Sequence, residues 1–61
     1  MNELLYAKDL AKEIALGEQT IRRLAKTCDD FPRIKIGGRT FYMKDEVLLW
    51  LRKCCRERVD L

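Results

Sequence analysis

Apolar side chains in the first part of the chain repeat at the spacing of an α-helix. Leu10, Ala11 and Ile14 occupy the i, i+1 and i+4 positions of one helix face, which predicts a first helix from about residue 8 to residue 15. Leu16-Gly17 interrupts that pattern, because glycine suits a tight turn or the N-cap of a following helix. The residues before this helix, 4–6, form a short apolar lead-in.

A second helix is predicted from about residue 18 to residue 28. Ile21, Leu24 and Cys28 give it an apolar stripe, and Ala25 lies beside that stripe. Pro32 follows shortly after, and the residue before a proline is pushed out of helical backbone angles. The second helix is therefore expected to end before residue 31.

Between residues 33 and 43 the pattern changes to alternation. Two runs rich in β-branched and aromatic residues flank Gly37-Gly38, which is a strong signal for a hairpin with a two-residue loop. In that register Ile36 faces Arg39 and Ile34 faces Phe41. One face of the hairpin would then carry Ile34, Ile36, Phe41 and Met43. The other face would carry Arg33, Lys35, Thr40 and Tyr42.

A last helix is predicted from about Asp45, as its N-cap, to about Arg58. A broad apolar arc runs along it and consists of Val47, Leu48, Trp50, Leu51, Cys54 and Cys55. Leu49 falls on the opposite, basic side of the helix. It is a candidate contact for another molecule, although single exposed leucines are common and need no special explanation.

The order helix, helix, hairpin, helix predicts an α+β fold class, and 61 residues make one small domain over residues 1–61. A chain of this length buries only about 60% of its unfolded surface, so its core is small. The first two helices and their short turn fit a helix-turn-helix. The fit rests on seven positions: Leu10, Ala11, Ile14, Ala15, Leu16, Ile21 and Leu24. A plain pair of antiparallel helices is the alternative interpretation.

Charge is distributed unevenly along the chain. Residues 1–21 have a net charge of −2, residues 22–44 have a net charge of +5, and the remainder is balanced. A basic middle between neutral flanks indicates one electropositive face, for which a polyanion is the natural partner. An ordinary solvated basic surface is the alternative, and charge alone does not decide between them.

The outer face of the second helix is expected to carry cations and an amide. At about 100° per residue, the positions around the arc opposite the apolar stripe are Gln19, Thr20, Arg22, Arg23 and Lys26. Arginine and glutamine can bond the edges of guanine and adenine in the major groove, and lysine suits phosphate. We expect no acidic residue among these cations, which favours DNA recognition over a merely solvated face.

Catalytic, metal and redox chemistry have little support in the sequence. There are three cysteines, no C-x-x-C spacing and no histidine, which argues against a disulfide framework, a zinc finger and a histidine general base. We therefore expect no enzymatic activity, no metal and no cofactor. Met1–Leu5 has no secretory pattern and no apolar run could span a membrane, so a cytoplasmic protein with reduced thiols is expected.

Two stretches together resemble the small excisionase-type and AlpA-like proteins, relatives of the MerR DNA-binding domain. They are LAKEIALGEQTIRRL at 10–24 and FPRIKIGGRTFYMKDEV at 31–47, followed by Trp50-Leu51. The resemblance implies a winged helix-turn-helix whose second helix enters the major groove. Gly17 and Ala7 stand where such proteins usually have a serine or threonine N-cap. Each replacement costs the helix start up to about 1 kcal/mol, and the cost is smaller for Gly17 because glycine is a tolerable N-cap.

The resemblance also implies the residues that contact DNA. The recognition-helix candidates are Gln19, Thr20, Arg22, Arg23 and Lys26, with Arg39 at the tip of the wing. Arg33 and Lys35 lie on the same hairpin, so we expect all three hairpin cations to touch phosphate or the minor groove.

Three functions are open at this point. The first is an excisionase-like recombination directionality factor of a phage or mobile element, which binds double-stranded DNA, bends it, associates cooperatively with further copies and assists a tyrosine-recombinase integrase. The second is a small AlpA-like transcriptional regulator with the same DNA contacts. The third is a protein-interaction module that docks through its apolar last helix.

Overall fold

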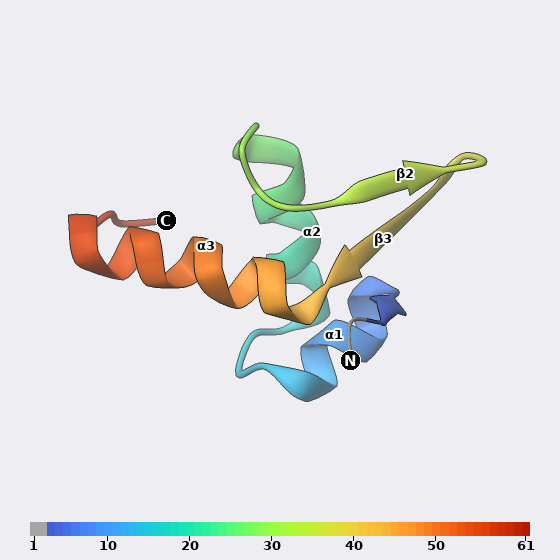
Figure 1. The fold of residues 1–61 in the computed structure, drawn as a ribbon, viewed down its shortest axis with the longest axis horizontal. Helices are drawn as coiled ribbons and strands as arrows, with labels where there is room; N and C mark the ends of the chain where they lie inside the picture. The colour runs from blue at the N-terminus through green and yellow to red at the C-terminus, as the bar shows by residue number, and fades with distance from the viewer. Residues whose placement is uncertain (1–2) are drawn as a thin grey trace.

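The computed structural model describes residues 3–61, so the first two residues of the segment inspected for a secretory signal lie outside it. The elements in chain order are β1 (Leu4–Leu5), α1 (Ala7–Glu13), α2 (Glu18–Thr27), β2 (Ile34–Ile36), β3 (Arg39–Met43) and α3 (Lys44–Glu57). The strands form one antiparallel sheet in the order β1-β3-β2 (Figure 1). The predicted α+β class and the order of helices and hairpin are confirmed, with β1 as an additional strand.

Helix α1 begins one residue earlier and ends two residues earlier than predicted. Tyr6, not Ala7, is its N-cap, and the Tyr6 carbonyl accepts the Asp9 and Leu10 amides at 3.0 and 2.9 Å. Ala7 is instead the first helical residue and is only 6% exposed, so a small side chain is needed there for packing rather than capping. Residues 14–16 belong to the turn, so Ala15 lies in the connection and is exposed.

Helix α2 begins at Glu18, as the sequence predicted. Gly17 is its N-cap with φ −74° and ψ 157°, and no side chain caps the helix. Glycine is not required by this backbone conformation, which any residue can adopt. The helix ends at Thr27, one residue before the predicted end, and Cys28 is the C-cap.

The hairpin forms in the predicted register. Ile34 pairs with Phe41, Lys35 with Thr40 and Ile36 with Arg39. Gly37 and Gly38 have φ of 58° and 81°, and two positive φ values are what a type I′ turn requires. On its other side β3 pairs with β1, which places Leu5 opposite Tyr42.

The two faces of the hairpin also divide as predicted. The face that carries Arg33 and Lys35 packs on the helices, whereas Arg39, paired with Ile36, lies on the opposite face. Tyr42, on the face that packs on the helices, is 3% exposed. On the opposite face Ile34 and Ile36 are 37% and 50% exposed, and Phe41 stacks on Tyr6 with ring centroids 5.1 Å apart. Much of the apolar face of the hairpin therefore lies at the surface.

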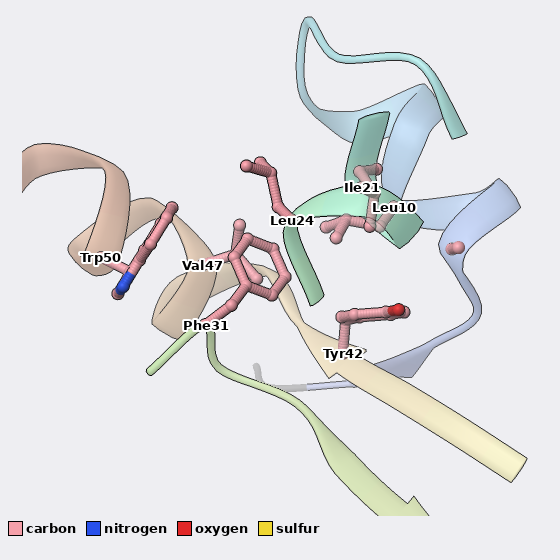
Figure 2. Packing of buried hydrophobic residues seen from close by; sticks show 8 residues of the cluster. Leu10, Ile21, Leu24, Phe31, Tyr42, Val47 and Trp50 are labelled. Carbon is pink, nitrogen blue, oxygen red and sulfur yellow. The ribbon is translucent and has the colours of Figure 1, made fainter. Parts of the chain in front are cut away.

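One core joins all three helices to β3. Its buried members are Ala7, Leu10, Ile21, Leu24, Phe31, Tyr42, Val47 and Trp50. Phe31, from the segment after α2, lies near its centre (Figure 2) and makes edge-to-face contacts with Tyr42 and Trp50, with ring centroids 6.0 and 5.0 Å apart. The linker between α2 and the hairpin is thus fixed by packing, which the sequence patterns did not predict.

Helix α3 begins at Lys44 with Met43 as its N-cap, so the prediction of Asp45 as N-cap is wrong. Asp45 lies in the first turn, where the helix dipole favours a negative charge. The predicted apolar arc is also too broad, because Leu48 is 39% exposed and Cys55 is exposed. Leu49 is 56% exposed, as its position on the helical wheel predicted.

The hairpin and the C-terminal half of α3 project in opposite directions from the body of the molecule (Figure 1). Within residues 3–61, none of the helices has the length and apolar character needed to cross a membrane.

Candidate nucleic-acid interface

An open groove of about 680 Å³ lies between α2 and the hairpin. Its lining includes three residues that are buried or partly buried in the core: Ala7, Ala25 and Tyr42. Five cations line it as well: Arg22, Lys26, Arg33, Lys35 and Arg39. No carboxylate lines the groove in the described part of the chain. The groove is therefore an electropositive depression that suits a polyanion.

These five cations come from three parts of the fold. Arg22 and Lys26 are one helical turn apart on α2, Arg33 precedes β2, and Lys35 and Arg39 belong to the two hairpin strands. All five are exposed. Lys26 and Lys35 have no side-chain hydrogen bond or ion pair within residues 3–61, whereas the three arginines also contact other groups of the chain. The structure thus brings together five of the eight predicted DNA-binding residues.

The other three predicted residues, Gln19, Thr20 and Arg23, do not line the groove. Gln19 and Arg23 are four residues apart on α2 and exposed, so they share the outer face of the helix. Thr20 is half-buried at the edge of that face. The predicted site therefore divides into a cationic groove and a separate outer face of α2.

Arg22 is paired with an acid, which contradicts the expectation that no acidic residue stands among these cations. Its Nη2 lies 2.6 Å from Oε2 of Glu18, one turn earlier on α2. The two side chains are 62% and 37% exposed, so the pair contributes only a few tenths of a kcal/mol. Its main effect is to orient Arg22 and to reduce the positive charge that this residue offers.

Arg33 holds the end of α2. Its Nη1 donates to the carbonyls of Phe31 and Cys28 at 3.1 and 3.4 Å. A guanidinium beside the last carbonyls of a helix is favoured by the helix dipole. Arg33 therefore has a structural contact in addition to its place in the groove.

Arg39 occupies the first position of β3, directly after the Gly37-Gly38 turn, as predicted for the tip of the hairpin. Its Nη1 donates to the Tyr6 hydroxyl at 3.1 Å. Tyr6 is held in turn by its stacking on Phe41. The cation at the hairpin tip is thus oriented by an aromatic residue from the start of the chain.

Tyr42 was not among the predicted site residues, although alternation placed it on the same hairpin face as Lys35. Its ring is buried and it lines the groove. Burial raises the pKa of the Tyr42 hydroxyl, and the nearby charges of Arg22 and Arg33 oppose that shift only in part. The hydroxyl therefore keeps its proton at neutral pH and can donate a hydrogen bond.

The cysteines lie apart from the groove lining. Cys28 and Cys54 are half-buried, Cys55 is exposed, and all three are free thiols. Burial raises the pKa of Cys54, and the acidic side chains of Asp30 and Glu57 raise it further, so this thiol is a poor nucleophile at neutral pH. Within residues 3–61, no three His, Cys, Asp or Glu side chains are grouped to hold a metal ion.

Comparison of the chain with protein-family models, curated proteins and solved structures finds no match. The function proposed for the chain therefore depends on the groove and on the outer face of α2.

Proposed function

We propose that the chain is a winged helix-turn-helix protein that binds double-stranded DNA. In this proposal α1, the turn and α2 form the helix-turn-helix, and the β2–β3 hairpin is the wing. The observation that carries it is the groove between α2 and the hairpin, which five cations and no carboxylate line, although Arg22 is paired with Glu18 outside the lining. A DNA backbone presents a row of phosphates, which such a groove can hold along its length.

The two parts of the site have different tasks in this proposal. The outer face of α2 reads base edges in the major groove, where Arg23 can bond guanine and Gln19 can bond adenine. The groove cations bind the flanking phosphates and fix the position of α2 on the duplex. Arg39, at the hairpin tip, reaches the backbone or the minor groove beside the contacted bases.

We further propose that the biological role is that of an excisionase-like recombination directionality factor. The support is the resemblance of residues 10–24 and 31–47, which in the structure form α1, the turn, α2, the hairpin and the start of α3. Such a factor bends DNA, loads in several copies and assists a tyrosine-recombinase integrase. An AlpA-like regulator would use the same contacts at a promoter, so footprinting on attachment sites and promoters distinguishes the two.

A protein-interaction module is favoured by one specific observation. Leu48 and Leu49 are 39% and 56% exposed on α3, on the part of the molecule that does not line the groove. If the function is docking through α3, replacing the groove cations should have no specific effect on duplex binding. The same titration therefore tests both proposals.

The test is a fluorescence-anisotropy titration of a labelled duplex at several salt concentrations. If the five groove cations each neutralise one phosphate, log affinity should fall against log salt with a slope of about −4 to −5. Replacing Lys26 and Lys35 by glutamine should reduce that slope by about two units, because two phosphate contacts are lost. Replacing Lys53 on α3 by glutamine is the matched control and should leave the slope unchanged. Absence of duplex binding, or an equal effect of Lys53→Gln, would contradict the proposal.

A further inference from the structure

We propose that the Tyr42 hydroxyl is a hydrogen-bond donor to a phosphate oxygen of the DNA backbone in the groove. This inference rests on the proposed DNA binding and adds to it a neutral contact at the base of the cationic groove. Tyr42 is therefore assigned a direct binding role in addition to its place in the core.

The position of Tyr42 is fixed by its surroundings. The residue is 3% exposed, and its ring meets Phe31 edge-on with centroids 6.0 Å apart. Its backbone lies in β3 opposite Leu5 of β1. Figure 2 shows the hydroxyl pointing away from Phe31 and Trp50. Such a side chain can hold a donor in place without losing conformational freedom when a ligand binds.

The hydroxyl has no internal partner. No hydrogen bond from it to another group is found among residues 3–61, although the residue is more than nine-tenths buried. Among the described residues, the fully buried polar atom without a partner is Nε1 of Trp50, so the Tyr42 hydroxyl itself reaches the surface of the groove. Because Tyr42 lines the groove, a ligand seated there can replace water as the acceptor of this hydroxyl.

The neighbours of the hydroxyl identify the kind of acceptor. The charges of Arg22 and Arg33 are close enough to act on it, and Lys35 lines the same groove. A donor in a groove that cations line, with no carboxylate among the lining residues, suits an anionic oxygen. A phosphate offers this oxygen together with further oxygens for the cations. Base edges are less suitable, because the residues able to read them lie on the outer face of α2.

The test compares Tyr42→Phe with the unaltered chain by the same duplex titration. The substitution keeps the ring and removes only the hydroxyl, so we expect about tenfold weaker binding, the effect of one hydrogen bond to a charged acceptor. The loss should be equal on unrelated duplex sequences, because phosphates carry no sequence information. The slope against salt should not change, because a neutral donor releases no counterion.

Thr27→Val is the matched control, since it removes a hydroxyl on α2 that bonds the Arg23 carbonyl and does not line the groove. It should bind duplex DNA within about twofold of the unaltered chain, as expected for a surface change outside the interface. Thermal melting is the second readout. Tyr42→Phe should melt at about the same temperature as the unaltered chain, because it removes a hydroxyl that has no hydrogen-bond partner among residues 3–61.

The outcomes separate this inference from the proposed function. If the unaltered chain fails to bind duplex DNA, both are overturned. If it binds with the expected salt dependence and Tyr42→Phe binds equally well, only the role of Tyr42 is overturned. A lower melting temperature for Tyr42→Phe would also overturn it, since the hydroxyl would then have an internal partner. Inorganic phosphate is the second probe: if it perturbs the Tyr42 resonances while Tyr42→Phe leaves duplex binding intact, the groove holds a free anion and the backbone assignment is wrong.

Discussion

Arg23 is the residue on which sequence recognition depends most in the proposed complex. It is exposed on the outer face of α2, away from the groove, and its charge is not paired with an acid among the described residues. Arg23→Ala should weaken binding to a duplex selected from a random pool by about 1–3 kcal/mol. Binding to an unrelated duplex should change much less. A gel-shift titration checks both values, and equal affinity of the variant for the selected duplex would remove Arg23 from base recognition.

Arg58 adopts φ 55° and ψ 46° directly after α3, a left-handed conformation that costs a residue with a side chain about 1–2 kcal/mol. The Val59 amide bonds the Cys54 carbonyl at 3.0 Å and the Arg58 amide bonds the Cys55 carbonyl at 3.2 Å, as in a Schellman motif. Arg58→Gly should therefore stabilise the fold, by about 0.5–1 kcal/mol after the greater freedom of glycine in the unfolded chain is counted.

Urea denaturation measures this change in the free energy of unfolding. Arg56→Gly is the matched control, because it removes the same charge from a helical position and should destabilise the fold by about 1 kcal/mol. If both substitutions destabilise the protein equally, the left-handed conformation of Arg58 is not present in solution.

The sequence predicted the positions of side chains that follow from helical periodicity, but it did not predict contacts between particular side chains. Gln19, Arg22, Arg23 and Lys26 are exposed on α2 because helical periodicity alone puts them opposite Ile21 and Leu24. The pairing of Arg22 with Glu18 was missed, although an i, i+4 pair of opposite charge was visible in the sequence. The contact between Arg39 and Tyr6 joins residues far apart in the chain, so no local pattern could indicate it.

At the scale of the elements, the hairpin is the part whose role in binding is most easily isolated. Arg39→Ala removes one cation from its tip, so the plot of log affinity against log salt should become shallower by about one unit. Tyr6→Phe removes the hydroxyl that accepts from Arg39 but keeps the cation, so the slope should be retained. An unchanged slope for Arg39→Ala would mean that the hairpin tip does not touch the DNA backbone.

The hairpin register was predictable because Gly37-Gly38 permits only a narrow set of turns. The composition of the two faces did not indicate which one packs on the helices. The more apolar face, with Ile34 and Ile36, is exposed, and the buried residue of the inner face is Tyr42. Strand β1 has two residues and shows no alternation of its own. These residues form a strand because they pair with the free edge of β3, and the tertiary fold brings the two segments together.

The end of α1 illustrates the same limit. Ile14 continues the apolar spacing of the helix, but its backbone is extended, with φ −124° and ψ 161°. Ile14 and Leu16 pack against the core from the turn, so their apolar character reflects burial rather than helical structure. Hydrophobic spacing alone does not distinguish these two causes.

For the whole molecule, stability depends on a core to which residues 3–61 contribute eight buried side chains. Phe31 is 2% exposed and contacts aromatic residues from β3 and α3. Phe31→Ala should cost about 3–5 kcal/mol, which approaches the total stability of about 3–9 kcal/mol for a domain of this size. Circular dichroism should therefore show a largely unfolded chain.

Ile36→Ala is the control for that substitution, because Ile36 is 50% exposed on the outer face of the hairpin and should cost well under 2 kcal/mol. If Phe31→Ala melts like Ile36→Ala, the linker after α2 does not hold the elements together. The position of the hairpin relative to α2 would then be less fixed than the groove requires.

The size of the molecule also bears on how copies assemble. One domain of this kind buries about 600–1,000 Å² on DNA, so a single copy should bind with modest affinity and several copies should load cooperatively. The free chain should be a monomer in sedimentation, because the exposed Leu49 alone is too small for a stable interface.

Leu49→Lys should reduce cooperative loading and DNA bending if this residue joins adjacent copies, as a footprint and a circular-permutation assay would show. Cooperative loading unaffected by Leu49→Lys would exclude Leu49 from the contact.

Nuclear magnetic resonance shows whether DNA lies across α2 and the hairpin. A uniformly ¹⁵N-labelled chain is titrated with a short duplex at low salt, and the shifts of the backbone amides are mapped onto the structure. We expect the largest shifts along α2 around residues 19–26 and along residues 33–42 of the hairpin, with little change in the C-terminal half of α3. Largest shifts around Leu48 and Leu49, or none on either side of the groove, would contradict this placement of the DNA.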